Sequence, residues 1–323
     1  MTTSIPQIII HTDNPEPARE IVHAAHPDIQ THACTSYDGL EPLLRETGAE
    51  VVFSVRFAGT PTYPRSVLVE SGLVKWLTVG GSGTDHLTPW DTKIVTVTNS
   101  AGVAADMMAE YVIGTLFTFS LNLRHFRQAQ EQHVWDRGTV APLAGRTILI
   151  LGLGKTGQAV ARLSKAIGMR VLGVRANPQP TDSVDEVIAM DAVGGLWGQA
   201  DIVVSCVPLL PTTRGMVDDA AFKAMKPGAL FVDVSRGGVV DQAALIGALQ
   251  TGHLGGAVLD VFEVEPLPQS SPLWDFENVL ITPHCCAIYD GWEKNSVKMF
   301  CENVTRYRQG KPLSNVVDPA RGY

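Results

Sequence analysis

The stretch Thr147-Ile-Leu-Ile-Leu-Gly-Leu-Gly-Lys-Thr-Gly157 decides the fold of the larger part of this chain. Its first five residues are apolar or β-branched, which is typical of a buried strand. A glycine-rich turn follows at once, and residues 158–167 have the pattern of a helix. A strand, a tight turn and a helix in this order predict the start of a unit with parallel strands.

The glycines of this turn have the GxGxxG spacing that favours binding of a dinucleotide. Gly152 permits the tight turn, Gly154 lets the backbone approach a pyrophosphate, and Gly157 lets the helix and the strand pack closely. The free N–H groups at the start of the helix attract phosphate. We therefore predict cofactor contacts along the whole turn, with a purely structural glycine turn as the alternative. The predicted contacts are Gly152, Leu153, Gly154, Lys155, Thr156 and Gly157.

The end of the next strand, Val171–Val174, indicates which dinucleotide binds. An acidic residue there would hold the ribose 2′-hydroxyl of NAD(H). The chain has Arg175 instead, and a guanidinium suits the 2′-phosphate of NADP(H). The sequence thus favours NADP(H) over NAD(H), and the alternative is an arginine that faces solvent.

Strands and helices alternate along most of the chain, and this rhythm predicts an α/β fold with two doubly wound parallel sheets. The first domain is expected to be flavodoxin-like and substrate-binding, over residues 1–100 and 286–323. A Rossmann domain that binds the dinucleotide, over residues 101–285, is expected to be inserted in it. The other predicted strands are residues 8–10, 51–53, 76–79, 94–97, 201–206, 229–234, 256–260 and 279–282. Helices are predicted over 106–131, either continuous or kinked, and 292–309.

Composition excludes several other classes of protein. The 323 residues carry a net charge of −8, which argues against binding nucleic acid or an anionic membrane. Five cysteines with no CxxC spacing indicate free thiols and no structural metal site. The first residues lack the features of a secretory signal, so we expect a cytoplasmic protein.

Three later segments place polar side chains after predicted strands. They contribute Arg236, Glu265 and His284. Reduction of a carbonyl by hydride needs a proton donor, and histidine suits that role near neutral pH. A carboxylate beside the histidine would orient the ring, and an arginine would hold a substrate carboxylate. Each residue alone has an ordinary alternative as a loop or surface group, but their joint occurrence after a dinucleotide motif favours catalysis.

The chain resembles the D-isomer-specific 2-hydroxyacid dehydrogenases, which include glyoxylate/hydroxypyruvate reductases. The segments that carry this resemblance are PLAGRTILILGLGKTGQAVA, ADIVVSCVPLLPTTRGMV, MKPGALFVDVSRGGVVDQAAL, GAVLDVFEVEPLP and ITPH. The resemblance implies that Arg236 holds the substrate and that His284 is the general acid, with Glu265 as its partner. It also implies that Asp260 contacts the nicotinamide carboxamide. Further implied cofactor contacts are Val207, Pro208, Thr213, Val234 and Ser235.

The resemblance also implies substrate contacts outside the cofactor domain. The turn Gly81-Ser82-Gly83 would offer N–H groups to the substrate carboxylate, and Arg56 is a further anchor or an exposed loop residue. Trp135 matches a position near the dimer interface, where it could reach the active site of the second subunit. We therefore expect a homodimer.

The resulting expectation is a reductase that uses NADPH to convert a small 2-oxo acid to the D-2-hydroxy acid. One alternative is a dinucleotide-sensing binding protein related to transcriptional corepressors. Another is NAD-linked oxidation of an unusual hydroxy acid. The pair Cys285-Cys286 after the histidine departs from the usual family pattern, and apolar packing or a redox role would explain it.

Overall fold

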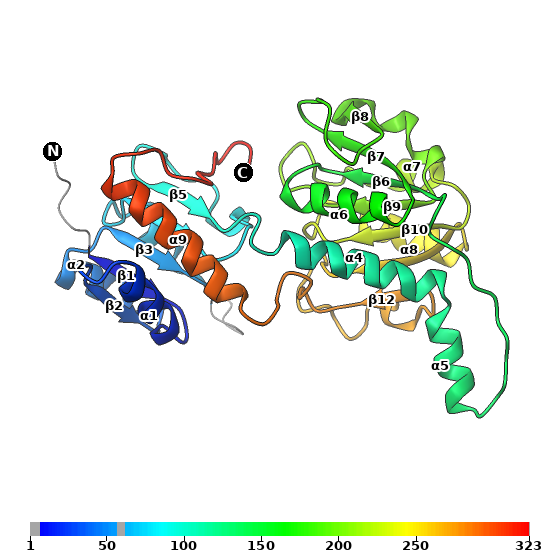
Figure 1. Ribbon diagram of the computed structural model, residues 1–323, viewed down its shortest axis with the longest axis horizontal. Coiled ribbons are helices and arrows are strands. Elements are labelled where there is room, and N and C mark those ends of the chain that lie inside the picture. Colours follow the sequence, from blue (N-terminus) through cyan, green and yellow to red (C-terminus); the bar gives the residue numbers. More distant parts are fainter. Residues whose placement is uncertain (1–6, 57–61, 323) are drawn as a thin grey trace. The chain divides into compact units, whose positions relative to one another are not determined.

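The computed structural model describes residues 7–56 and 62–322 and divides the chain into two compact units. One unit contains the chain up to Val103 together with the segment from Asp290 onward, and the other runs from Ala104 to Tyr289. Figure 1 shows the chain leaving the first unit after β5 (Thr96–Asn99) and returning to it as α9 (Trp292–Arg308).

The described part of the first unit contains a sheet of five parallel strands in the order β2-β1-β3-β4-β5. This is the flavodoxin-like order, in which the direction of winding reverses between β1 and β3. Besides β5, the strands are β1 (Ile8–His11), β2 (Thr31–Cys34), β3 (Val51–Ser54) and β4 (Trp76–Val79). Besides α9, the helices are α1 (Glu16–Ala25), α2 (Leu40–Thr47) and α3 (Arg65–Val69).

Both faces of this sheet are covered because its strands are apolar on both sides. Phe53 and Trp76 point to the face covered by α1 and α9, where they contact Phe300 of α9. Val52 and Leu77 point to the opposite face, which α2 and α3 cover. The apolar runs at 8–10, 51–53 and 76–79 thus lie in strands, as predicted.

The described part of the second unit contains seven parallel strands in the order β12-β11-β10-β9-β6-β7-β8. This order contains the Rossmann arrangement, and its winding reverses between β6 and β9. The strands are β6 (Thr147–Leu151), β7 (Arg170–Arg175), β8 (Glu186–Ala189), β9 (Ile202–Ser205), β10 (Ala229–Asp233), β11 (Leu254–Leu259) and β12 (Val279–Ile281). The helices are α4 (Ala105–Ser120), α5 (Leu123–Glu131), α6 (Lys155–Ala166), α7 (Asp219–Ala224) and α8 (Gln242–Gln250).

Helices cover both faces of this sheet as well. α4 packs against α6 over one face, where Ile148 and Ile150 of β6 are buried. α7 and α8 cover the other face, where Leu149 and Leu151 are buried. The fold class is therefore the predicted one, with two doubly wound parallel sheets.

Several predicted elements have different bounds in the structure. The strand expected at 94–97 begins at Thr96, because Ile94 and Val95 belong to a turn that hydrogen-bonds to the carbonyl of Asp91. The helix expected at 158–167 begins at Lys155, inside the glycine motif. The segment 106–131 is two helices, because Asn122 between them adopts a left-handed backbone conformation with φ of 50°.

The structure also shows whether a helix could span a membrane and whether the cysteines are paired. Among the described residues, no helix has both the length and the apolar character needed to cross a bilayer. The five cysteines all lie in the described ranges, and none of them forms a disulfide.

Candidate active site

His284 and Glu265 lie on two neighbouring loops at the carboxyl ends of β12 and β11. His284 Nδ1 is 2.7 Å from Glu265 Oε2, and both side chains are partly exposed, at 43% and 35%. Because Glu265 occupies Nδ1, the ring is fixed so that Nε2 is the nitrogen available to a ligand. This arrangement suits a histidine that transfers a proton through Nε2.

The second oxygen of Glu265 anchors the carboxylate to the backbone. Oε1 accepts a hydrogen bond from the Phe262 N–H at 3.0 Å. Burial would raise the pKa of Glu265, but the hydrogen bonds from His284 and Phe262 and the charges of His284 and Arg236 lower it below its usual range. Glu265 therefore stays ionised near neutral pH and keeps its hydrogen bond to the imidazole.

Asp260 organises the turn that carries the histidine. Its carboxylate accepts hydrogen bonds from the Thr282 hydroxyl at 2.6 Å and from the N–H groups of Cys285 and Cys286 at 2.9 and 3.1 Å. Its backbone carbonyl accepts the His284 N–H at 2.8 Å. Asp260 has no exposed surface. The structure thus places Asp260 beneath the histidine, and its contact with a nicotinamide carboxamide stays a prediction.

A tyrosine that no sequence motif indicates completes this support. Tyr111 of α4 lies with its hydroxyl 2.6 Å from the Thr282 hydroxyl. Thr282 gives its own proton to Asp260, so Tyr111 is the donor in this contact. Burial raises the pKa of Tyr111 above its usual range and keeps that proton in place. Only the folded structure could reveal it, because Tyr111 is 171 residues from Thr282 in the sequence.

Arg236 lies on the loop after β10. In the strand order, β10 is next to β11, whose loop carries Glu265. We call His284 and Glu265 together the histidine pair. Its Nη1 donates to the carbonyl of Ser235 at 2.7 Å, and its charge helps to lower the pKa of Glu265. Ser235 in turn donates to the Asp233 carboxylate through its hydroxyl at 2.5 Å and its N–H at 3.0 Å. The three predicted catalytic residues therefore come from adjacent loops of one sheet edge.

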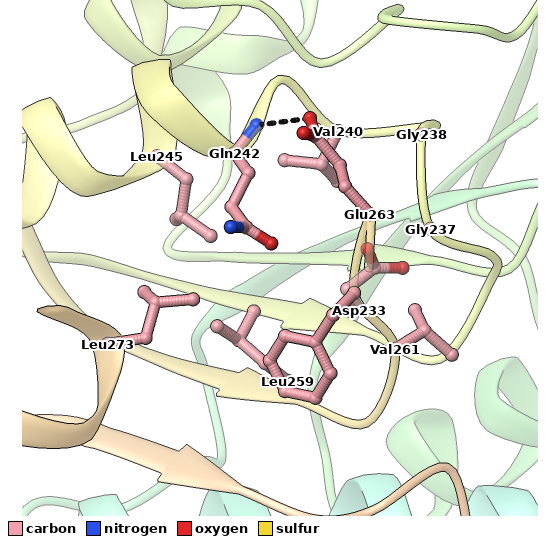
Figure 2. Close-up of a pocket in the computed structure, with 11 residues that line it drawn as sticks. Asp233, Gly237, Gly238, Val240, Gln242, Leu245, Leu259, Val261, Glu263 and Leu273 are labelled. Atoms are coloured by element: carbon pink, nitrogen blue, oxygen red, sulfur yellow. Dashed lines mark hydrogen bonds between the residues drawn. The ribbon is translucent and has the colours of Figure 1, made fainter. Parts of the chain in front are cut away.

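Two glycines fix the course of the chain after Arg236. A side chain at Gly237 would meet the Phe262 carbonyl oxygen at 1.8 Å, and Gly238 has φ of +89°. Figure 2 shows both glycines on the loop after Asp233, and it shows Glu263 bonded to the Gln242 N–H. The backbone next to Arg236 is thus in direct contact with the segment that carries Glu265.

The glycine turn after β6 has the geometry that its motif predicts. A Cβ on Gly157 would meet the Gly152 carbonyl oxygen at 1.9 Å, so α6 can approach the strand only with glycine there. Gly152 has φ of +93° and lies against Val207, which follows β9. This turn therefore lies where the winding of the sheet reverses, which is the usual ligand position in such sheets.

The turn also has space for a phosphate. A Cβ on Gly154 would meet no atom within 4 Å, and no side chain caps the start of α6. Lys155 is exposed in the first turn of that helix. Open space, uncapped N–H groups and a cation fit a dinucleotide pyrophosphate. By contrast, Leu153 packs inward against Gly173, and the Thr156 hydroxyl lies against the Met108 sulfur.

Arg175 is the last residue of β7 and is partly exposed. Within residues 7–56 and 62–322, no hydrogen bond or ion pair of its guanidinium is found. That cation is therefore available to a ligand. The structure is compatible with a 2′-phosphate contact, which stays a prediction.

The remaining predicted cofactor residues are mainly buried. Val207 and Val234 are core side chains, and the Ser235 hydroxyl is held by Asp233. The Thr213 hydroxyl donates to the Pro208 carbonyl at 2.6 Å and accepts from the Leu210 N–H at 2.8 Å. These side chains shape the loops. Because their polar groups already have partners in the protein, a bound cofactor would contact mainly their backbone and hydrocarbon atoms.

The predicted substrate residues of the first unit lie on loops after β3 and β4. Three successive carbonyls are held from inside the unit: Ser296 donates to that of Gly80, Ser100 to that of Gly81, and Asn99 to that of Ser82. In the described ranges, no hydrogen bond from the N–H groups of 81–83 is found. These donors suit an anion, and Arg56, two residues after the end of β3, is exposed.

Trp135 lies in the second unit, beyond α5, and its side chain is 96% exposed. The Trp135 side chain therefore packs against little of its own chain. Across the described ranges, no group of three or more His, Cys, Asp or Glu is arranged to hold a metal ion.

The glycine turn 152–157 and the pair His284–Glu265 both lie in a region of the chain that matches a known protein family. A family model described as the D-isomer specific 2-hydroxyacid dehydrogenase, NAD binding domain, matches residues 113–286, which is more than half of the chain. The chain belongs to the D-isomer-specific 2-hydroxyacid dehydrogenases. It is therefore an NAD(P)-dependent oxidoreductase with a Rossmann domain, as the sequence predicts.

Other D-isomer-specific 2-hydroxyacid dehydrogenases are similar over almost the whole chain. One from Xanthobacter autotrophicus Py2, solved with NADPH and MES, is 32% identical with a TM-score of 0.85, covering 99% of this chain and 100% of that one. An NADPH-dependent glyoxylate/hydroxypyruvate reductase from Sinorhizobium meliloti, solved with NADP and sulfate, is 26% identical with a TM-score of 0.83, covering 98% and 100%. A glyoxylate reductase from Korarchaeum cryptofilum is 32% identical over 231 residues, 69% of either chain.

Proposed function

We propose that this chain reduces a small 2-oxo acid, such as glyoxylate or hydroxypyruvate, to the D-2-hydroxy acid with NADPH as the reductant. The observation that carries the proposal is the 2.7 Å contact between His284 and Glu265, on loops next to that of Arg236. A proton donor, a carboxylate that holds it and a cation are the groups that this reduction needs.

The proposed roles follow from the chemistry of each side chain. Arg236 binds the substrate carboxylate and polarises the carbonyl. The cofactor, when bound, supplies the hydride that forms a C–H bond at the carbonyl carbon. His284 Nε2 gives its proton to the carbonyl oxygen as the C=O π bond breaks. Glu265 keeps the imidazole oriented and stabilises its charged form before that transfer.

The cofactor preference rests on Arg175 and on the missing carboxylate at the end of β7. The two solved relatives named above contain NADPH or NADP. We propose that Arg175 binds the 2′-phosphate and that the turn 152–157 binds the pyrophosphate. We also propose that Asp260, which supports the loop of His284, contacts the nicotinamide carboxamide.

We propose that Arg56 and the N–H groups of Gly81, Ser82 and Gly83 bind the substrate. Support comes from the exposed guanidinium and from the turn whose carbonyls are held by internal hydrogen bonds. We also propose a homodimer in the cytoplasm. Exposed apolar side chains cluster in one stretch of the second unit, and a second copy of the chain would cover them. They are Leu121, Leu123, Val134, Trp135 and Val140.

The experiment is an initial-rate panel of 2-oxo acids with NADPH and with NADH, for the wild type and for Arg175→Asp. We expect turnover of at least one small 2-oxo acid, faster with NADPH, and a shift toward NADH in the variant. Dinucleotide binding without turnover of any 2-oxo acid would favour a sensor. An unchanged cofactor ratio in Arg175→Asp would remove Arg175 from the 2′-phosphate site.

A further inference from the structure

Asp233 is a buried carboxylate at the carboxyl end of β10, two residues before Ser235. It is 3% exposed, and one of its oxygens, Oδ1, receives both the N–H and the hydroxyl of Ser235. The two contacts, at 3.0 and 2.5 Å, leave Ser235 little freedom to rotate. The sequence analysis assigned no role to Asp233.

Ser235 passes this constraint to Arg236. Its carbonyl oxygen accepts a hydrogen bond from Arg236 Nη1 at 2.7 Å. The backbone of Ser235 is therefore held on both sides of its Cα, since Asp233 binds its N–H and Arg236 binds its C=O. A change in the orientation of Ser235 would move the carbonyl that the guanidinium uses as a support.

The other side of Arg236 is fixed by a different contact. Gly237 lies so close to the Phe262 carbonyl that a side chain there would meet it at 1.8 Å, and the Phe262 N–H binds Glu265. The contact at Gly237 sets the position of the loop relative to the histidine pair. Asp233 is the corresponding support on the amino-terminal side of the arginine, through Ser235.

We propose that Asp233 is a positioning residue that holds Arg236, through Ser235, in the orientation that binds the substrate carboxylate. This inference rests on the proposed function, since it takes Arg236 to be the group that binds that carboxylate. Asp233 itself touches neither the substrate nor the cofactor. Its role is to supply hydrogen-bond acceptors at the position where Ser235 needs them.

If Asp233 acted only through its charge, its removal would lower the KM for the substrate, whereas loss of a positioning residue would raise it. Where Asp233 is ionised, its charge interacts with that of Arg236, so removing it would make the site more positive and strengthen binding of an anionic substrate. A positioning role predicts weaker binding when the acceptors are lost. The two roles therefore differ in the sign of the change in KM.

The test compares Asp233→Ala, which removes the acceptors, with Asp233→Asn, whose amide oxygen can still accept from Ser235. We expect Asp233→Ala to raise the KM for the 2-oxo acid roughly three- to tenfold, the range for loss of one or two hydrogen bonds. The KM for NADPH should stay unchanged. In Asp233→Asn the KM for the 2-oxo acid should stay close to that of the wild type, although both variants lack the charge.

Ser235→Ala is the second variant, because it keeps the backbone contact and removes only the hydroxyl. It should raise the same KM by a smaller factor even if Asp233→Ala does not fold. Asp185→Ala is the matched control: it removes a carboxylate that accepts the Val171 N–H at 2.8 Å, beside β8, the strand farthest from β10 in the strand order. Its KM should equal that of the wild type.

The decisive comparison repeats both changes in an Arg236→Ala background. If Asp233 and Ser235 act through the guanidinium, neither change should raise KM further there. An equal rise in both backgrounds would overturn the proposal, as would a lower KM in both Asp233 variants. Absence of turnover in the wild type would instead contradict the proposed function, so the two failures are distinguishable.

Discussion

At His284 the backbone has φ of 52°, a conformation that residues other than glycine rarely adopt. The His284 N–H and those of the two following cysteines all bind Asp260, which holds the turn in this conformation. Such a conformation persists only where its surroundings enforce it. The support under the histidine is therefore as much a part of the site as the imidazole.

Replacement of His284 by alanine should remove proton transfer and leave the turn in place. We expect turnover to fall on the order of 10²- to 10⁴-fold, the usual range for loss of a general acid. Fluorescence titration with NADPH should give an affinity close to that of the wild type. Loss of cofactor binding in the variant would instead assign His284 a structural role.

Asp233 should also affect how stability depends on pH. Burial raises its pKa to about 7, against the opposing effect of the Ser235 hydrogen bonds. In the unfolded chain the pKa is about 3.9, so the folded state binds the proton more tightly. The free energy of unfolding should therefore fall as pH rises between these two values, by at most about 4 kcal/mol.

Asp233→Asn removes this titration. The variant should gain stability relative to the wild type as the pH is raised from 5 to 8, because the wild type must then bury a charge. Urea unfolding at several pH values measures the difference. A wild type and a variant whose stabilities change in parallel across that range would show that Asp233 titrates at its ordinary pKa.

At the scale of elements, the glycines of the turn after β6 serve different purposes. Gly157 allows α6 to lie against the backbone of Gly152, whereas Gly154 leaves open space at the start of the helix. Gly157→Ala should destabilise the fold and lower the melting temperature, because the added methyl group meets backbone.

Gly154→Ala should keep the melting temperature of the protein without cofactor, since its Cβ meets nothing within 4 Å. Its affinity for NADPH should fall at least tenfold if the pyrophosphate occupies that space. Calorimetry of both variants with and without NADPH separates the two effects. Equal cofactor affinity in Gly154→Ala and the wild type would place the pyrophosphate elsewhere.

The elements that the sequence predicted best are those with continuous apolar runs. β6 was predicted with correct bounds because all five of its residues are buried. β2 and β8, at sheet edges, were missed, since their segments THAC and EVIA are only partly buried and carry polar residues. Local composition therefore predicts strands that have a continuous apolar run, including the edge strand β12, and fails at the edge strands β2 and β8.

The candidate site, like the sheets, was predictable only in part. Arg236, Glu265 and His284 follow apolar strands within recognisable motifs, so sequence was enough to nominate them. Tyr111 and Asp233 were not predictable, because their importance depends on burial and on partners that only the fold brings together. The role predicted for Asp260 was drawn from resemblance, and the structure adds its contacts beneath the histidine.

At the scale of the whole molecule, the segment 121–140 exposes apolar side chains that a monomer would leave in water. Trp135 is the most exposed of them, at 96%. We expect sedimentation of the wild type as a dimer at micromolar concentration, and Trp135→Ala should weaken the association. A wild type that sediments as a monomer would contradict this assignment of the segment.

The most direct test of the central claim follows an isotope through the reaction. NADPH that carries deuterium at both C4 positions is incubated with pyruvate or hydroxypyruvate, and the product is analysed by mass spectrometry and on a chiral column. We expect one deuterium at C2 of the D-2-hydroxy acid, and almost no product with His284→Ala. A product without deuterium, or of the L configuration, would contradict hydride transfer to a carbonyl held by Arg236 and protonated by His284.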